Sequence, residues 1–152
     1  MNAYRRTSSR GFTLVEILIV VIILGILAAI VIPQFTNAST EARQSNVRSQ
    51  LQTLRSQIEL YKLQHKDVPP ALASVGWTVF TQYTDIDGGV SATKTLTHIY
   101  GPYYQTPPTN PLSDSILIDT AAADETGWIY NETTGAISAM AGKAIADGIF
   151  EE

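Results

Sequence analysis

The sequence predicts an α+β protein in which one long N-terminal helix packs on a small antiparallel β-sheet. Three observations predict this fold: an unbroken apolar run over residues 17–32, an apolar stripe at helical spacing over residues 47–61, and a turn-rich C-terminal part. They divide the 152 residues into a basic leader (1–11), a transmembrane helix (12–33), a stem helix (34–66) and an α+β head (67–152).

The apolar segment is long enough to cross a membrane. From Phe12 to Ile32 only Thr13 and Glu16 are polar, and about 21 helical residues span roughly 30 Å, the thickness of the hydrocarbon core. Three arginines precede the segment, and the next basic residue is Arg43. This bias predicts a cytoplasmic N-terminus with the head on the other side of the membrane.

Two ordinary explanations of the segment leave features unexplained. A cleaved secretory signal has an apolar region of about 7–15 residues, and this run is longer and is followed by Ile32-Pro33-Gln34-Phe35, a poor cleavage site. A plain membrane anchor fits the hydropathy but gives no reason for Gly11 or for Glu16. A glutamate within a span costs about 2.5–3.5 kcal/mol at the bilayer centre and less near its edge.

The run from Arg10 to Glu16, Arg-Gly-Phe-Thr-Leu-Val-Glu, resembles the cleavage and methylation signature of type IV pilins and type II secretion pseudopilins. The signature has a basic leader, a glycine, a phenylalanine that begins the mature chain, and a glutamate at the fifth mature position. Pro33 also stands where the family commonly has a proline, and it is expected to kink the helix.

The resemblance implies specific roles for three residues. A membrane-bound prepilin peptidase would cut between Gly11 and Phe12 and methylate the new amine of Phe12, which stays cationic. Phe12 and Glu16 are four residues apart, on one helix face. Glu16 is therefore expected to meet a Phe12 amine, its own or, as the family favours, that of a neighbouring subunit during assembly. The alternative is that Glu16 only stabilises the positive end of its own helix.

The implied function is that of a structural subunit of a type II secretion pseudopilus, a helical filament that supports protein secretion across the outer membrane. Its implied partners are other pseudopilins in a homopolymer, the prepilin peptidase, an inner-membrane assembly platform and membrane lipid. A type IV pilin of a surface pilus, serving adhesion, motility or DNA uptake, is the alternative. The chain has no cysteine, so it lacks the disulfide-closed loop of many such pilins. A membrane-tethered binding module would share the helix without needing cleavage.

The stem is predicted as a continuation of the same helix. Val47, Leu51, Leu54, Ile58 and Tyr61 recur at spacings of four and three residues, which gives one narrow apolar stripe suited to packing on a sheet. The pattern stops near residue 65, before two prolines. The expected helix has about 50 residues and a length of roughly 75–80 Å. Residues 61–70 also resemble the stem-to-head transition of the major pseudopilin.

The head is expected to contain short strands joined by turns. Residues 115–119 read as a strand, and residues 127–138 read as a hairpin around a five-residue loop. Residues 67–94 and 100–111 lack helical periodicity and are rich in turn-forming residues. A three- or four-stranded antiparallel sheet lying on the stem stripe is therefore predicted.

Composition argues against several other functions. Residues 67–152 carry eleven acidic and two basic side chains, so this head is not expected to bind nucleic acid. The sequence contains no P-loop, dinucleotide fingerprint or nucleophile elbow, and no enzymatic activity is expected. His65 and His98 stand apart in the sequence and are predicted to be ordinary surface residues.

Calcium is the one cofactor that the sequence leaves open. Major pseudopilins commonly bind this ion in a C-terminal loop, and four acidic residues near the predicted hairpin offer oxygens: Asp114, Asp119, Asp124 and Glu125. Calcium takes six to eight oxygens, and these four do not make a complete ligand pattern. Solvated turn residues are the alternative.

Overall fold

The computed structural model describes residues 11–141 and 149–150, which form two compact units that divide between Thr40 and Glu41. Its helices are α1 (Leu14–Gln64), α2 (Leu72–Val75) and α3 (Thr78–Thr81). Its strands are β1 (Tyr83–Thr84), β2 (Val90–Ser91), β3 (Ile118–Asp119), β4 (Trp128–Tyr130), β5 (Ile137–Met140) and β6 (Ile149–Phe150).

Helix α1 is a single element of 51 residues, which confirms the predicted long helix. It ends where Lys66 and Asp67 take left-handed φ angles of 58° and 64°, and the Asp67 N–H donates to the Lys62 carbonyl at 2.9 Å. The same carbonyl also accepts from the His65 N–H at 3.1 Å, so two hydrogen bonds to one acceptor close the last turn of the helix. The helix continues through Pro33, and the predicted kink there stays a prediction.

The N-terminal unit consists of the apolar part of α1. This helix is long and apolar enough to cross a membrane by length and composition, and none of its most apolar window is buried within the subunit. Large side chains on every side of it are exposed, among them Leu14, Ile19, Leu24 and Ile30. The helix therefore has no apolar partner within the described part of its own chain.

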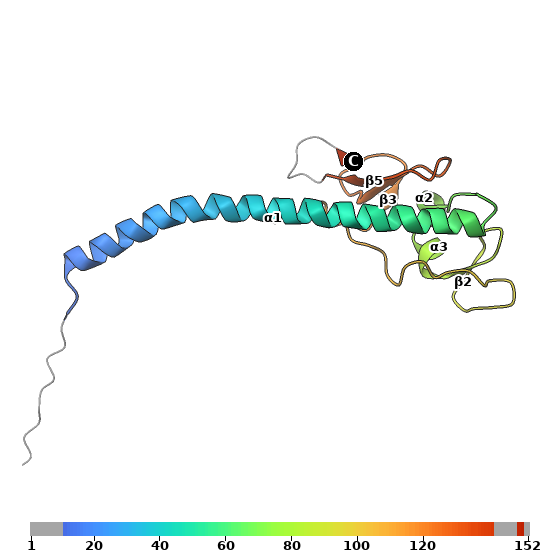
Figure 1. Ribbon diagram of the computed structural model, residues 1–152, viewed down its shortest axis with the longest axis horizontal. Helices are drawn as coiled ribbons and strands as arrows, with labels where there is room; N and C mark the ends of the chain where they lie inside the picture. Colours follow the sequence, from blue (N-terminus) through green and yellow to red (C-terminus); the bar gives the residue numbers. More distant parts are fainter. Residues whose placement is uncertain (1–10, 142–148, 151–152) are drawn as a thin grey trace, which may run out of the picture. The chain divides into compact units, whose positions relative to one another are not determined.

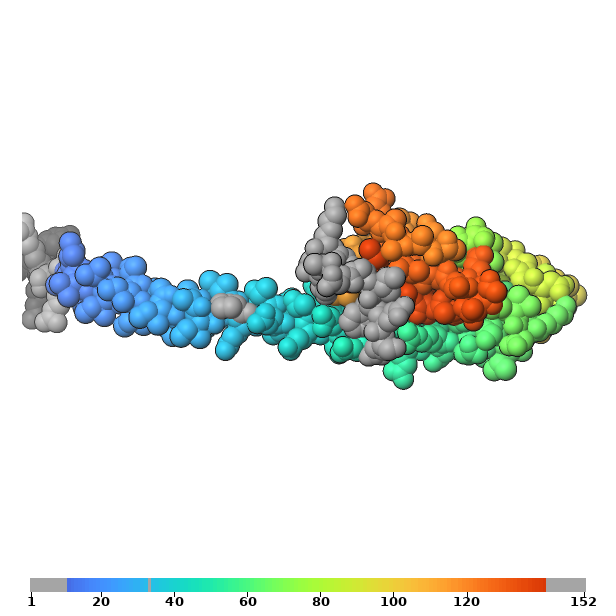
Figure 2. Space-filling view, turned by 90° about the horizontal axis from the view of Figure 1, so that it is seen from above, coloured from blue at the N-terminus to red at the C-terminus, as the bar shows by residue number. Residues whose placement is uncertain are grey.

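The second unit contains the stem stripe, and its burial is as predicted. Val47, Leu51 and Leu54 are fully buried, and Ile58 and Tyr61 are nearly so. They pack with residues of the head in one cluster, whose other members are Leu72, Trp77, Val79, Phe80, Trp128, Tyr130, Ile137 and Ala139. Figure 2 shows the orange and red part of the head lying along the green part of α1.

The main sheet has four strands in the order β3-β4-β5-β6. Figure 1 shows β3 and β5 on one side of the outer part of α1 and α3 and β2 on the other. Strands β4, β5 and β6 pair antiparallel, whereas β3 pairs parallel with β4. The predicted antiparallel sheet is thus confirmed for β4, β5 and β6, and β3 adds one parallel pairing at its edge. The chain loops back after β3 before it enters β4, and the N–H groups of Gly127 and Trp128 both donate to the Leu117 carbonyl at the start of that pairing.

The predicted hairpin is formed by β4 and β5. Its turn is held by the Asn131 side chain, which accepts from the Thr133 and Thr134 N–H groups at 2.9 and 3.1 Å. Gly135 supplies a φ of 77° that side-chain-bearing residues rarely adopt. The turn also carries Glu132, whose carboxylate accepts from the N–H and the hydroxyl of Ser74, both at 2.7 Å. These contacts fasten the turn to α2.

Asn110 holds the head together from its interior. Its side chain is fully buried and its amide donates to the carbonyls of Gly127 and Met140 at 2.7 and 2.8 Å. Its side-chain oxygen accepts from the Leu112 N–H at 2.8 Å. Nearby, the Trp128 indole donates to the Pro108 carbonyl at 2.9 Å. One buried amide thus links the chain crossing at residues 100–111 to both hairpin strands.

Candidate functional site at the N-terminus of the long helix

Thr13 and Glu16 form a reciprocal cap at the start of α1. The Glu16 N–H donates to the Thr13 hydroxyl oxygen at 3.2 Å. In return, the Thr13 N–H and hydroxyl both donate to Glu16 Oε2 at 3.1 Å. This geometry is a capping box, in which two helix-terminal donors are satisfied by two side chains three residues apart. The glutamate of the motif therefore has a defined partner within its own chain.

The sequence prediction missed Thr13. The spacing Thr-x-x-Glu directly before an apolar run is itself a signal for a capping box, so the pattern could have identified it. The contact agrees with the alternative in which Glu16 stabilises its own helix terminus. It leaves the predicted role of Glu16 toward a Phe12 amine untested, because the chain is described as a single copy.

Gly11 and Phe12 lie in open chain before the cap. Phe12 is 78% exposed, and a Cβ built on Gly11 would meet no atom within 4 Å. Gly11 is also absent from the glycines with positive φ. Among the described residues, 11–141 and 149–150, neither packing nor backbone conformation therefore requires a glycine at position 11.

The predicted calcium residues do not form a site in the described part of the chain. Among the described residues, no three His, Asp or Glu side chains are grouped so that they could hold a metal ion. Asp119 accepts from the Thr120 N–H at 2.6 Å, and Asp114 lies 3.8 Å from the Arg43 guanidinium. Glu125 and Asp124 are exposed. Calcium binding at these residues stays a prediction.

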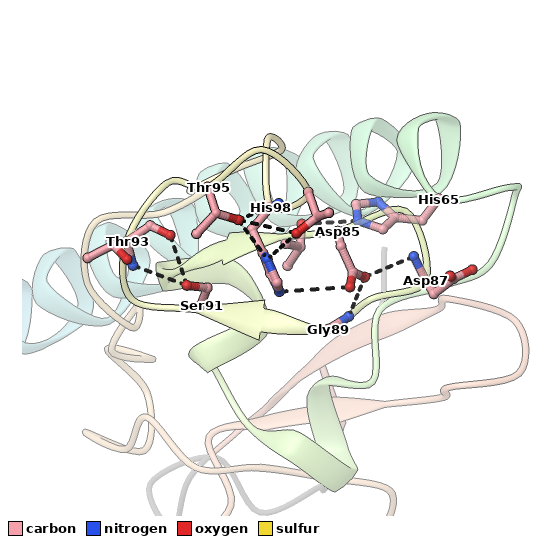
Figure 3. A network of polar contacts seen from close by, with 10 residues as sticks. His65, Asp85, Asp87, Gly89, Ser91, Thr93, Thr95 and His98 are labelled. Atoms are coloured by element: carbon pink, nitrogen blue, oxygen red, sulfur yellow. Dashed lines mark hydrogen bonds and ion pairs between the residues drawn. The ribbon is translucent and has the colours of Figure 1, made fainter.

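His65 corrects the expectation for the histidines, because it is buried rather than exposed. It is 2% exposed and stacks on Tyr61 with ring centroids 3.7 Å apart. Its Nδ1 lies 2.8 Å from the Tyr61 carbonyl, so Nδ1 carries a proton and donates, while Nε2 lies 3.0 Å from the Thr84 hydroxyl. Burial, followed by the nearby Tyr103 and Asp85, raises the pKa of Tyr61 to about 12. Figure 3 shows His65 beside a second polar group around His98 and Asp85.

The comparisons with known proteins match the N-terminal motif. Residues 6–32 match the family model described as "Prokaryotic N-terminal methylation motif". This match covers the residues on which the cap is built and most of the apolar helix. No solved structure matches the chain.

Two classes of relatives are similar to the chain. It is 42% identical over 65 residues to the type II secretion system core protein G of Klebsiella michiganensis. It is 41% identical over 73 residues to the type IV major fimbrial protein FimA of Dichelobacter nodosus, and 39% identical over 61 residues to the type IV narrow pilus major component PilA5 of Thermus thermophilus.

The matched segments span 43%, 48% and 40% of this chain, and 46%, 46% and 53% of these three relatives. The likeness to these relatives thus covers about half of each protein. The methylation motif nevertheless agrees with the capped glutamate, the exposed Phe12 and the uncovered apolar helix. The chain thus carries the N-terminal methylation motif at residues 6–32 and is similar, over less than half of its length, to a type II secretion core protein G and to type IV pilins.

Proposed function

We propose that this chain is a structural subunit of a type II secretion pseudopilus. It is made as a precursor, cut between Gly11 and Phe12, methylated on the Phe12 amine and drawn from the membrane into a helical homopolymer. The filament supports the secretion of other proteins across the outer membrane. The head, on the far side of the inner membrane from the N-terminus, forms the outside of the filament.

The observation that carries this proposal is an apolar helix that no described residue of its own chain covers, preceded by an exposed Gly11–Phe12 bond. In lipid this helix is stable, because acyl chains cover it. Outside lipid, about 16 consecutive apolar residues can be shielded only by the same helix of other copies. A homopolymer with these helices in its interior provides this shielding. A monomeric head that stays anchored in lipid does not need such shielding.

The cut itself follows from the N-terminal geometry. In the described part of the chain nothing packs against Gly11, and its place in the motif fits recognition by a peptidase that acts on this bond. Cleavage leaves Phe12 with a cationic amine one turn from the Glu16 carboxylate. In the filament we assign Glu16 to the Phe12 amine of a neighbouring copy. The inner-membrane assembly platform is the further partner that the proposal requires.

A type IV pilin is the second candidate, and the likeness to FimA and PilA5 supports it. The absence of cysteine and the similarity to core protein G favour the pseudopilus. Deletion of the gene separates the two candidates. Loss of secreted proteins from the medium with surface fibres intact supports the pseudopilus, and loss of surface fibres with normal secretion supports the pilus.

A Glu16→Ala variant tests the filament itself. We expect the variant to be inserted and cut between Gly11 and Phe12 but not to assemble, since the partner of the Phe12 amine is gone. Glu41→Ala, which removes an exposed carboxylate from the same helix, is the matched control and is expected to assemble normally. Filaments of normal yield from Glu16→Ala would contradict the role assigned to Glu16.

A further inference from the structure

Leu96 is an apolar side chain that an ordered loop after β2 holds out into solvent. The leucine is 100% exposed. Before it, the Ser91 hydroxyl donates to the Thr93 carbonyl at 2.8 Å. Around it, the His98 N–H donates to the Thr95 hydroxyl at 3.0 Å, and Figure 3 shows both contacts. The loop is therefore held by polar contacts of its own, and its leucine side chain is free to contact another molecule.

A small pocket lies between the last residues of α1 and the turn after β1. Its volume is about 110 Å³, and its apolar wall is formed by Tyr61, Val68, Ile86 and Gly88. An apolar cavity of about 150 Å³ accepts benzene, so this pocket has room for a smaller, branched aliphatic side chain. Val68 and Ile86 are 57% and 40% exposed, so this apolar wall meets solvent when the subunit is alone.

Gly88 keeps the pocket open. Its φ of 87° is a conformation that residues with side chains rarely adopt. A Cβ built on Gly88 would lie 2.9 Å from Tyr61 Oη, so a larger residue at this position would fill the pocket. Asp85 fixes the turn, because its Oδ1 accepts from the N–H groups of Asp87 and Gly89 at 3.0 and 2.8 Å.

The charged side chains beside the leucine and beside the pocket have opposite signs. Lys94 stands two residues before Leu96, and Asp67 directly follows Lys66, which lines the pocket. Lys94 and Asp67 are exposed, and within the described part of the chain neither has an ion-pair partner. Lys66 is already paired with Asp87 at 2.6 Å. The pocket thus offers an unpaired carboxylate at its rim, and the loop offers an unpaired ammonium group.

We propose that Leu96 of one copy of this chain inserts into the pocket beside Asp67 of a second copy. The same contact brings Lys94 of the first copy to the Asp67 carboxylate of the second. This contact rests on the proposed function, since it is one of the surfaces through which the subunits of the filament meet. It removes the leucine and the apolar wall from water, and the ordered loop loses little conformational freedom when it binds.

The direction of the contact suits a filament. Leu96 and the pocket are different surfaces of one chain, so the contact is heterologous and leaves one free leucine and one free pocket at the two ends of any assembly. Contacts of this kind continue into rings or helical polymers. Figure 1 shows β2 beside the outer end of α1, so the leucine and the pocket belong to the same end of the head. The contact therefore joins neighbouring heads side by side.

Cross-linking in isolated filaments tests the contact. The chain has no cysteine, so introduced cysteines are its only thiols. Leu96→Cys and Val68→Cys are combined in one chain, and the filaments are treated with a short bifunctional maleimide. We expect a ladder of covalent multimers. The control combines Leu96→Cys with Leu117→Cys, a leucine that is 52% exposed just before β3, and it is expected to remain monomeric.

The outcomes separate this contact from the proposed function. Filaments of normal yield without a ladder overturn the contact and leave the proposed function intact. Products that stop at dimers also overturn it, because they show two copies that exchange loops in a closed pair. If the wild-type chain forms no filament at all, the proposed function and the contact are overturned together.

Substitution of the leucine gives a second measurement. Because Leu96 is fully exposed in the single subunit, Leu96→Ser is expected to leave the unfolding of the head unchanged. We expect it to lower the filament yield about tenfold, since the burial of a leucine is lost. Leu117→Ser is the matched control and should give a normal yield. A normal yield from Leu96→Ser would overturn the proposal.

Charge reversal tests the polar part of the contact. Lys94→Glu is expected to lower the filament yield about two- to fivefold, the range for an exposed ion pair. Adding Asp67→Lys to the same chain reverses the pair and should restore the yield. A double variant that assembles no better than Lys94→Glu alone would show that these two side chains do not meet.

Discussion

Glu16 is held in a fixed position before any other copy of the chain approaches it. Its Oε2 accepts two hydrogen bonds from Thr13, and its own N–H returns one. A carboxylate fixed in this way loses little conformational freedom on meeting a cation. The capping box therefore does not compete with the assembly role proposed for Glu16. It holds the Glu16 carboxylate at the helix end, where the proposed contact with a Phe12 amine would form.

The cap can be tested by two substitutions of Thr13. Thr13→Val removes the hydroxyl at nearly constant shape, and we expect the first turn of α1 to lose about 1 kcal/mol of local stability. Amides of residues 14–17 should then exchange faster in micelles. Thr13→Ser keeps the hydroxyl and should retain the protection. Equal exchange in both variants would show that the capping box does not stabilise this turn.

Asn110 is the residue on which the interior of the head depends most. Asn110→Ala removes the side-chain donor from the carbonyls of Gly127 and Met140 and the acceptor of the Leu112 N–H, and each lost hydrogen bond costs about 0.5–1.5 kcal/mol. The Gly127 carbonyl keeps the Met140 N–H as a donor. We expect the free energy of unfolding to fall by about 2–4 kcal/mol. The fluorescence of Trp77 and Trp128, both in the head, reports the unfolding transition.

Asn46→Ala is the matched control for Asn110→Ala. Asn46 is exposed on α1 and its loss should change stability by no more than about 0.5 kcal/mol. If Asn110→Ala is as mild as this control, the hydrogen bonds of Asn110 are not what holds the crossing to the hairpin.

At the scale of single elements, the two halves of α1 differ in what covers their apolar side chains. The part up to Thr40 is exposed throughout the described side chains, whereas the stem buries one narrow stripe and leaves its other faces in solvent. The stem is thus stabilised by the head of its own chain. The apolar half needs lipid or other copies, which is why we place the polymer contacts there.

Leu54 and Leu63 provide a matched pair on the stem. Leu54 is fully buried in the stripe, and Leu63 is 82% exposed on the same helix. Leu54→Ala is expected to lower the free energy of unfolding of the head by about 2–5 kcal/mol, and Leu63→Ala to change it by less than about 0.5 kcal/mol. The same fluorescence measurement applies. A larger effect at Leu63 than at Leu54 would contradict the observed packing.

The sequence allowed α1 and the hairpin to be predicted because both are governed by local rules. The stripe from Val47 to Tyr61 has one helical period, and the turn residues around Gly135 are typical of a hairpin loop. Helix α2 could not be predicted, since it has no capping side chain of its own and its Ser74 is held by Glu132, which lies 58 positions later in the chain. The parallel pairing of β3 with β4 likewise depends on contacts between distant segments.

The candidate site was predicted in its motif but not in its geometry. Gly11, Phe12 and Glu16 followed from the motif, whereas the partner of Glu16 within the chain, Thr13, did not. The burial of His65 was missed because its partner Thr84 lies 19 positions away. Sequence patterns identify residue types at fixed spacing, and they do not show which side chains meet across the fold.

For the molecule as a whole, the head depends on several tyrosines that favour their neutral form. Burial raises the pKa of Tyr103, Tyr104 and Tyr130, as it raises the pKa of Tyr61 to about 12. A raised pKa stabilises the folded state below the usual value near 10, and this contribution is lost as pH rises through the folded value.

We therefore expect the melting temperature of the head to fall steeply between about pH 10 and about pH 12. Tyr61→Phe should make the fall shallower, because one of the groups that titrates is gone. Thermal unfolding followed by tryptophan fluorescence over this pH range measures both slopes. An equally steep fall in Tyr61→Phe would mean that Tyr61 does not contribute to alkaline instability.

The central claim, that the chain is processed for assembly into a filament, is tested most directly by the mass of its mature N-terminus. Protein isolated from the native membrane and analysed by mass spectrometry should begin at Phe12 and carry the added mass of one methyl group on that amine. A chain that begins at Met1 with an unmodified N-terminal segment would contradict the claim.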